Sequence, residues 1–252
     1  MNSEKRILVI GDACNDEFVY GKCTRLCPDA PVPVFIPQEI VTNGGMGKNV
    51  QANVKSLGYK CDLICQSNLV TKTRYVDEKT NHTFLRVDTG EWSVDRVKGL
   101  TVELLNSYDA IIVSDYNKGF LHEEDIEFVC RNHPLVFIDT KKHINQFCSK
   151  AAYIKINEIE YNNSKDVLES DEYFDNLIVT LGDKGCRYKR VLFPVNKVEV
   201  KDMSGAGDTF MAALVCTYLK TQDIVQSIEC ANVCASTVVQ KKGVVTIEKG
   251  VC

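Results

Sequence analysis

Short apolar runs and helix-like runs alternate along most of this 252-residue chain. The apolar runs are rich in β-branched residues, and most of them end at a Gly, Asp, Asn or Ser. Such alternation predicts an α/β fold with a mostly parallel sheet and helices on both faces. Strands are expected at Arg6–Ile10, Cys61–Cys65, Ala110–Val113, Leu135–Ile138, Tyr153–Ile156 and Leu177–Leu181. Helices are expected at Asn49–Leu57, Leu121–Arg131, Asp208–Leu219 and Asp223–Val239.

Three stretches do not fit this alternation, because they look like half-exposed strands with no helix between them. They are Glu17–Tyr20, Val32–Val41, and the pair Lys72–Asp77 with Thr83–Asp88. We expect a small second sheet, a discontinuous lid from about 16–42 and 70–90, protruding from one domain that spans 1–252. Pro33 and Pro37 cannot donate ladder hydrogen bonds, so their strand should lie at an edge or carry a bulge.

The charge balance excludes two classes of partner. The formal net charge is −4 and the pI is near 5.7, so no broad basic field exists to hold nucleic acid or an anionic membrane. No apolar run approaches the roughly 20 residues that span a bilayer. The run Ile7–Ile10 is too short for the core of a signal peptide. We therefore expect a cytoplasmic protein.

Twelve cysteines are many for a chain of this length. No two of them form a C-x-x-C pair and the four histidines are scattered, so the spacing of a zinc site is missing. Without an export signal, the cysteines are expected to be reduced thiols that pack as small apolar side chains.

The strongest motif is the segment 202–210, with the sequence DMSGAGDTF, which runs directly into an apolar helix. Its small residues Gly205, Ala206 and Gly207 let backbone N–H groups converge at a helix N-terminus, where they would stabilise charge on a transferring phosphoryl group. Asp208 stands at the helix start as a candidate base. An Asp there also complements the helix dipole, so the motif alone assigns no function.

A second glycine-rich segment, NGGMGKN, precedes the helix expected after Asn49. It does not fit the P-loop, because Asn49 and not Ser or Thr follows Lys48. It does not fit the dinucleotide fingerprint either, because Val50 takes the place of the third glycine. By itself it reads as a flexible turn.

Taken together and in this order, the two segments resemble the two signatures of the PfkB family of carbohydrate kinases. Between them lie an N-x-x-E match, Asn157 to Glu160, and a T-x-G-x-x-G match at Thr180, Gly182 and Gly185. The resemblance runs from Ile7 to about Thr246. It implies a ribokinase-like fold and an ATP-dependent kinase that transfers the γ-phosphate to a sugar hydroxyl, with Asp208 as the base.

Within that family, several segments resemble the heptose 7-phosphate kinases. These segments begin at Gly11, Ala30, Lys72, Leu85, Ser114 and Asp139. The physical argument points the same way, because a sugar phosphate needs cationic partners that a neutral sugar does not. Lys72, Arg74, Arg86 and Lys118 would supply them, although each taken singly also fits a solvated surface charge.

The resemblance implies roles for the remaining candidate residues. The sugar would be held by Asp16, Gly44, Gly45, Asn49 and Asp115 beside the four cations. The nucleotide would be bound by Asn157, Glu160, Thr180, Gly182, Gly185 and Asn232. Asn157 and Glu160 would also organise Mg²⁺ through its water molecules. The sequence leaves open whether a monovalent cation is required, and a homodimer formed through the lid is expected, with a monomer as the alternative.

One departure from the family pattern puts the substrate in question. Family members carry a glycine-rich loop, a helix and a further strand before the lid strands, whereas only Gln66–Thr71 remains here. Part of the wall of the sugar pocket is therefore missing. Two alternatives stay open: a kinase for a neutral sugar or nucleoside, and a shortened relative that binds a sugar or nucleotide without catalysis.

Overall fold

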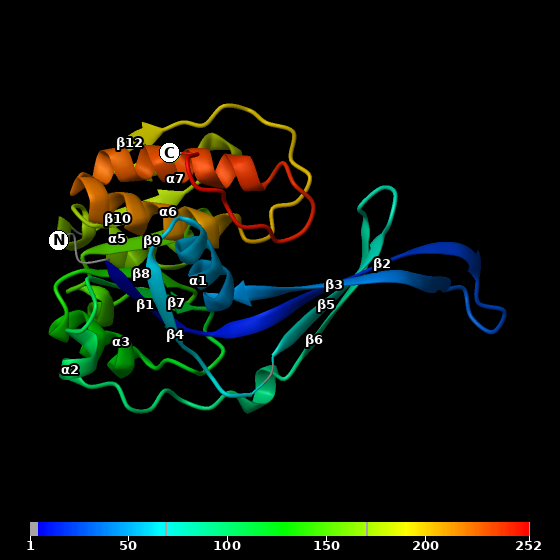
Figure 1. Cartoon of the computed structure of the whole chain (residues 1–252), viewed down its shortest axis with the longest axis horizontal. Coiled ribbons are helices and arrows are strands. Elements are labelled where there is room, and N and C mark those ends of the chain that lie inside the picture. The colour runs from blue at the N-terminus through cyan, green and yellow to red at the C-terminus, as the bar shows by residue number, and fades with distance from the viewer. Residues whose placement is uncertain (1–4, 69, 170, 252) are drawn as a thin grey trace.

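The computed structural model describes residues 5–68, 70–169 and 171–251 and contains two sheets (Figure 1). The main sheet has eight strands in the order β12-β11-β10-β9-β8-β7-β1-β4. Its strands are β1 (Arg6–Gly11), β4 (Lys60–Ile64), β7 (Ala110–Asp115), β8 (Val136–Thr140), β9 (Tyr153–Asn157), β10 (Leu177–Thr180), β11 (Cys186–Tyr188) and β12 (Val191–Phe193). The pairs from β4 to β10 are parallel, and only β11 and β12 pair in the antiparallel sense. The predicted mostly parallel sheet is confirmed, and its antiparallel end was not predicted.

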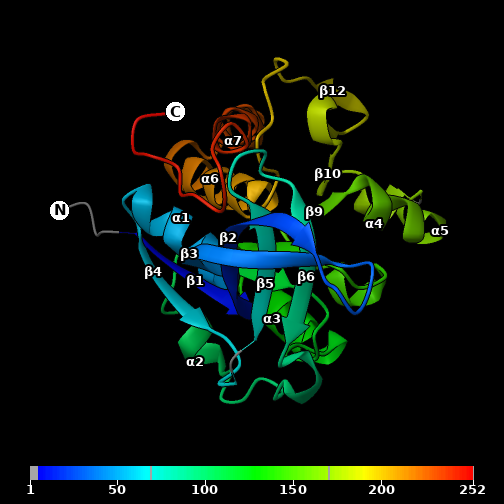
Figure 2. The same ribbon diagram turned by 90° about the vertical axis from the view of Figure 1, so that its right-hand side faces the viewer.

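Helices cover both faces of the main sheet, as expected (Figure 2). One face packs against α1 (Gly47–Ser56), α6 (Ala206–Thr221) and α7 (Ile224–Val238). The other packs against α2 (Val102–Leu105) and α3 (Glu123–Asn132). Short helices α4 (Glu158–Asn163) and α5 (Lys165–Leu168) follow β9. Consecutive residues of β1 enter opposite cores, which explains why this strand reads as a continuous apolar run.

The second sheet, here called the lid, projects from one side of the main body (Figure 1). Its strands are β2 (Ala13–Leu26), β3 (Pro33–Met46), β5 (Thr71–Asp77) and β6 (Thr83–Thr89), in the order β3-β2-β5-β6. The strand with the two prolines is an edge strand, and its pairing with β2 is interrupted by two register shifts. That prediction is confirmed, although β2 and β3 extend further than the sequence indicated.

The register of the lid gives its two faces different characters. One row across the four strands is Asn43, Asp16, Lys72 and Asp88. Because neighbouring residues of a strand point to opposite faces, the row Ile40, Val19, Tyr75 and Leu85 lies on the other side. The polar face includes Phe18, which packs against Val244 of the main body. The charged residues of the lid therefore lie on the face that meets the main body.

The shortened connection between the main sheet and the lid is held by one buried side chain. The Gln66 amide receives a hydrogen bond from the Ala13 N–H at 3.0 Å and donates one to the Ala13 carbonyl. Gln66 thus takes the place of a neighbouring strand for Ala13. This contact holds the first residue of β2, the strand that carries Asp16.

Most of the described cysteines are buried, as expected of thiols that fill a core. Cys230 departs from that expectation because it is disulfide-bonded. In the described part of the chain, no helix is long and apolar enough to cross a membrane.

Candidate active site

Asp208 lies where the N-termini of α1 and α6 meet, and it is 4 % exposed. Its Oδ2 accepts a hydrogen bond from Asn49 Nδ2 at 2.9 Å, and its Oδ1 accepts one from Tyr116 Oη at 2.8 Å. Asn49 comes from the first glycine-rich segment, and Tyr116 follows β7. The two motifs that were weak alone therefore form one site.

Burial raises the pKa of Asp208 to about 6. The hydrogen bonds from Asn49 and Tyr116 lower this pKa, nearby Asp139 raises it, and Lys155 lowers it. Burial and the neighbouring Asp208 hold the pKa of Tyr116 well above its usual range, so its hydroxyl stays a donor. A carboxylate with a pKa near 6 is ionised at neutral pH and remains basic enough to accept a proton.

The turn before α6 is shaped by glycine. Gly205 is the N-cap of the helix, with φ near 79°, and a Cβ there would lie 2.5 Å from Asn49 Nδ2. Any side chain at Gly205 would therefore strain the backbone and push Asn49 away from Asp208. The Ala206 N–H, the first of α6, donates to the Met203 carbonyl at 3.3 Å. The next N–H groups of the helix have no partner within it, so they can bind an anion.

A buried lysine that the sequence did not indicate lies beside this turn. Lys155, on β9, is 3 % exposed, and its Nζ is 2.6 Å from Oδ2 of Asp139. A Cβ on Gly207 would be 3.1 Å from that Nζ, which places the ammonium against the loop. Lys141 bridges Glu160 and Asp139 nearby. Lys155 sits one residue before Ile156 in an apolar strand, so no local pattern reveals it.

Asn157 and Glu160 form a reciprocal cap at the start of α4. Asn157 Oδ1 accepts the Glu160 N–H, and Glu160 Oε2 accepts the Asn157 N–H, at 2.9 and 2.8 Å. Glu160 is also paired with Lys141. No group of three or more His, Cys, Asp or Glu in the described ranges could hold a metal. The donor set therefore fits Mg²⁺ only if the ion is held mainly by phosphates and water.

A cavity of about 400 Å³ lies between the segment after β12 and helix α7. Asn232 lines it and donates from Nδ2 to the Phe193 carbonyl at 3.0 Å. Apolar side chains from Val195, Val198 and Val233 form much of the remaining wall. Thr180, Gly182 and Gly185 lie around the turn from β10 to β11 and are not in that wall.

The lid brings Asp16 and Arg74 together at 2.5 Å. A Cβ on Gly45 would be 2.0 Å from Asp16 Oδ2, so only glycine leaves room for this carboxylate. Gly44 packs against Lys48, whose Nζ donates to Asn15 Oδ1 at 2.9 Å. The sequence-predicted sugar residues on β2, β3 and α1 therefore lie close together.

The other three predicted cations lie on the lid or in the loop after β7. Arg86 pairs with Asp88 through two hydrogen bonds, at 2.7 and 2.6 Å. Lys72 and Lys118 both approach Glu91, which the sequence did not single out. Lys72 Nζ also lies 5.6 Å from the centre of the Tyr116 ring.

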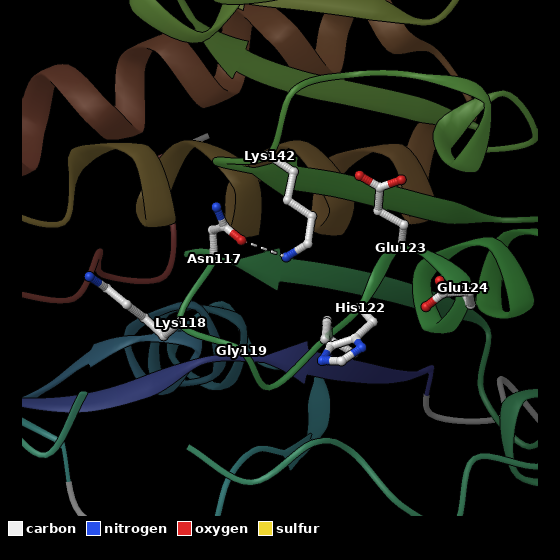
Figure 3. Close-up of a pocket in the computed structure, with 8 residues that line it drawn as sticks. Asn117, Lys118, Gly119, His122, Glu123, Glu124 and Lys142 are labelled. Carbon is white, nitrogen blue, oxygen red and sulfur yellow. Dashed lines mark hydrogen bonds between the residues drawn. The ribbon is translucent and has the colours of Figure 1, made fainter. Parts of the chain in front are cut away.

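Asp115 is fully buried and receives hydrogen bonds from Lys142, Thr140 and the Asn117 N–H. Asp12, next to it, accepts N–H groups of Tyr116 and Lys118. These contacts shape the loop that carries Tyr116. Lys142 and Asn117 meet in a shallow pocket of about 500 Å³ on the α3 side of this loop, from which Lys118 extends away (Figure 3).

Residues 118–249 match the model of the family described as "pfkB family carbohydrate kinase". This match covers more than half of the chain and includes the Gly205–Asp208 turn. The chain belongs to the pfkB family of carbohydrate kinases. Members of this family are ATP-dependent phosphotransferases that act on alcohol groups, so the predicted enzyme class is confirmed.

Relatives and solved structures agree with this assignment. The chain is 30% identical to the bifunctional protein HldE of Nitratiruptor sp., over 96% of this chain and 63% of that protein. It is 32% identical to HldE of Helicobacter pylori strain P12, over 95% and 64%. The chain thus spans less than two thirds of these curated relatives. A putative ribokinase from Agrobacterium tumefaciens shares the fold, with a TM-score of 0.75, 16% identity and coverage of 98% and 95%.

Proposed function

We propose that this kinase transfers the γ-phosphate of ATP to a hydroxyl of a phosphorylated sugar similar to heptose 7-phosphate. One observation carries the proposal. The Tyr116 side chain donates its hydroxyl to Asp208 and lies with its ring beneath Lys72. Asp208 and Lys72 are therefore one tyrosine ring apart, and Lys118 pairs with Glu91, the carboxylate that Lys72 also approaches. A sugar with a reactive hydroxyl at one end and a phosphate at the other fits this spacing.

In this proposal Asp208 is the base that accepts the proton of the attacking hydroxyl, and no other carboxylate has that role. Asn49 and Tyr116 hold the carboxylate in place through its two oxygens. The N–H groups of Gly205, Ala206 and Gly207 receive the negative charge on the transferring phosphoryl group. Lys155 adds a fixed positive charge beside that loop. Asp16, Gly44 and Gly45 hold the sugar, together with Asn49.

In this proposal the nucleotide binds at the cavity between the segment after β12 and α7. The cavity beside Asn232 has apolar walls that suit a purine base, and Thr180, Gly182 and Gly185 would approach the rest of the nucleotide. Bound Mg²⁺ would neutralise charge on the ATP phosphates, with Asn157 and Glu160 orienting its water molecules. An Arabidopsis thaliana ribokinase complexed with ribose and ATP has the same fold, with a TM-score of 0.70 at 14% identity.

The relatives support the substrate class only in part, since their identity is near 30% and the chain covers less than two thirds of them. A neutral sugar is the second candidate. It is favoured by the carboxylates that lie beside all four cations, because a cation paired with a carboxylate attracts a phosphate less strongly.

The test is to incubate the protein with Mg-ATP and pairs of sugars that differ only in a distal phosphate, and to follow ADP release. The proposal expects a higher kcat/KM for the phosphorylated member of a pair. A preference for the neutral member would replace it with the second candidate. No ADP release with any sugar, from a protein that still binds ATP, would favour the non-catalytic alternative.

A further inference from the structure

One carboxylate is shared by two lysines where the lid joins the main body. Glu91 follows β6 and opens the 3₁₀ turn Glu91–Ser93. Its Oε2 accepts a hydrogen bond from Lys118 Nζ at 2.7 Å, and its Oε1 lies 3.9 Å from Lys72 Nζ. Lys72 belongs to lid strand β5, whereas Lys118 belongs to the loop after β7. Three separate segments therefore meet at this carboxylate.

The two arginines of the same cluster are compensated differently. Arg74 is paired with Asp16, and Arg86 is paired with Asp88. Each arginine thus has a carboxylate of its own, while the two lysines share Glu91. Asp88, opposite Lys72 in the lid, also faces both lysines, since each of them lowers its pKa. Against these four cations the cluster supplies three carboxylates, Asp16, Asp88 and Glu91, so one positive charge is in excess.

Glu91 is itself only partly satisfied. Its Oε1 is buried and accepts no hydrogen bond, and the distance to Lys72 is too long for one. The preceding Gly90 has φ near 82°, which glycine adopts without strain, and its carbonyl accepts a hydrogen bond from Asn68 Nδ2 at 3.1 Å. Withdrawal of the carboxylate from the lysines would therefore break one hydrogen bond, from Lys118, and one long ion pair, with Lys72.

We propose that Glu91 occupies the anion site formed by Lys72 and Lys118 before the substrate binds. When a phosphorylated sugar binds, its distal phosphate displaces the Glu91 carboxylate from the two lysines. This inference rests on the proposed function. A phosphate carries about −1.5 to −2 charges at pH 7 and three acceptor oxygens, so it neutralises two lysines better than a single carboxylate does. A neutral sugar would leave the Glu91 pairs in place and gain nothing from the lysines. Since Lys72 belongs to the lid and Lys118 to the main body, a phosphate bound by both would also tie the lid to the main body.

The first test is the variant Glu91→Gln, compared with Glu127→Gln, which removes one carboxylate from an exposed pair with Arg131. Loss of the internal anion should lower KM for a phosphorylated sugar by about threefold or more, the scale of one partly exposed ion pair. KM for the same sugar without phosphate should not change. If Glu91 merely links the lid to the body, KM should rise for both sugars by the same factor, and the proposal falls.

The second test measures binding without catalysis. Inorganic phosphate is titrated into the protein in the presence of saturating ADP, which fills the nucleotide site. Glu91→Gln should bind phosphate more tightly than the parent chain, and adding Lys72→Ala with Lys118→Ala should remove the gain.

The two tests separate this inference from the proposed function. Tighter phosphate binding by Glu91→Gln, in an enzyme that turns over only neutral sugars, would keep the anion site and refute the substrate class. Turnover of phosphorylated sugars with unchanged KM and phosphate affinity in Glu91→Gln would refute the role of Glu91 alone.

Discussion

Asn49 and Asp208 are 159 positions apart in the chain, yet Asn49 Nδ2 donates to Asp208 Oδ2 at 2.9 Å. The bond joins the N-terminus of α1 to that of α6, so both glycine-rich segments open onto one space. Gly205 lets the two helices approach this closely, because a Cβ there would collide with the Asn49 amide. Each motif alone is weak evidence of function, because the site forms only where the two motifs meet.

The first prediction concerns Asp208→Asn. The exchange keeps the size of the side chain but removes the base, so the variant should fold while kcat falls by about 10²-fold or more. The measurement is ADP release under saturating Mg-ATP, with circular dichroism to check folding. Near-normal turnover would show that Asp208 is not the base.

The same variant should reveal the cost of burying this carboxylate. The folded-state pKa of Asp208, about 6, lies above the ordinary value of 3.8, so the native state binds the extra proton between these pH values. The parent chain therefore loses stability as pH rises through this window, whereas Asn does not titrate. The free energy of unfolding of Asp208→Asn minus that of the parent should grow by about 2–3 kcal/mol from pH 4 to pH 7. Parallel denaturation profiles at both pH values would contradict the raised pKa.

A pH profile can also test Tyr116→Phe. The hydroxyl of Tyr116 lowers the pKa of Asp208, so its removal should raise that pKa further. The acidic limb of kcat/KM should move up by about half a pH unit to one unit, the scale of one hydrogen bond. Tyr108→Phe is the matched control, because it removes a hydroxyl that donates to a carboxylate, Asp62, at the surface. An equal shift in both variants would mean that Tyr116 does not act through Asp208.

Asn53 is expected to position Asn49. It is fully buried, and its Nδ2 donates to the backbone carbonyl and to Oδ1 of Asn49 at 2.9 and 3.0 Å. With Oδ1 of Asn49 occupied, its Nδ2 is directed at Asp208. Asn53→Ala should lower stability by about 1–3 kcal/mol, because the Ile247 N–H loses its acceptor. It should also shift the acidic limb upward, whereas Asn145→Ala, which removes a cap far from Asp208, should affect stability only.

The cationic face of the lid gives a further prediction. Lys72→Ala together with Arg74→Ala should raise KM for a phosphorylated sugar strongly, by about tenfold or more, since two charge-assisted contacts are lost. KM for ATP should barely change, and Lys220→Ala, at the end of α6, should have no effect. If phosphorylated and neutral sugars lose equally, these residues support the lid and do not select the substrate.

The sequence predicted what is encoded locally and missed what is brought together by the fold. Each parallel strand of the main sheet has its own run of apolar residues, and all six were placed within a few residues of their observed ends. Strands β11 and β12 have three residues each, too few for a period to show. Tyr116, Lys155 and Glu91 surround the candidate site from different elements. Nothing in their local sequence indicates that they converge, although Tyr116 stood within a motif already singled out.

The last prediction is that two copies associate through their lids. The outer face of the lid carries the row Ile40, Val19, Tyr75 and Leu85, whose two end residues are 63 % and 56 % exposed. Phe84 and Val87 are also partly exposed on β6, so the apolar surface is continuous along that edge. Packing outer face on outer face would bury it and leave each charged face directed at its own site. Light scattering at micromolar concentration should give twice the 28.3 kDa of one chain. Ile40→Lys with Leu85→Lys should yield single chains, whereas Val191→Lys, the same kind of exchange on β12, should not. A parent chain with the mass of one copy, with or without substrate, would rule the dimer out.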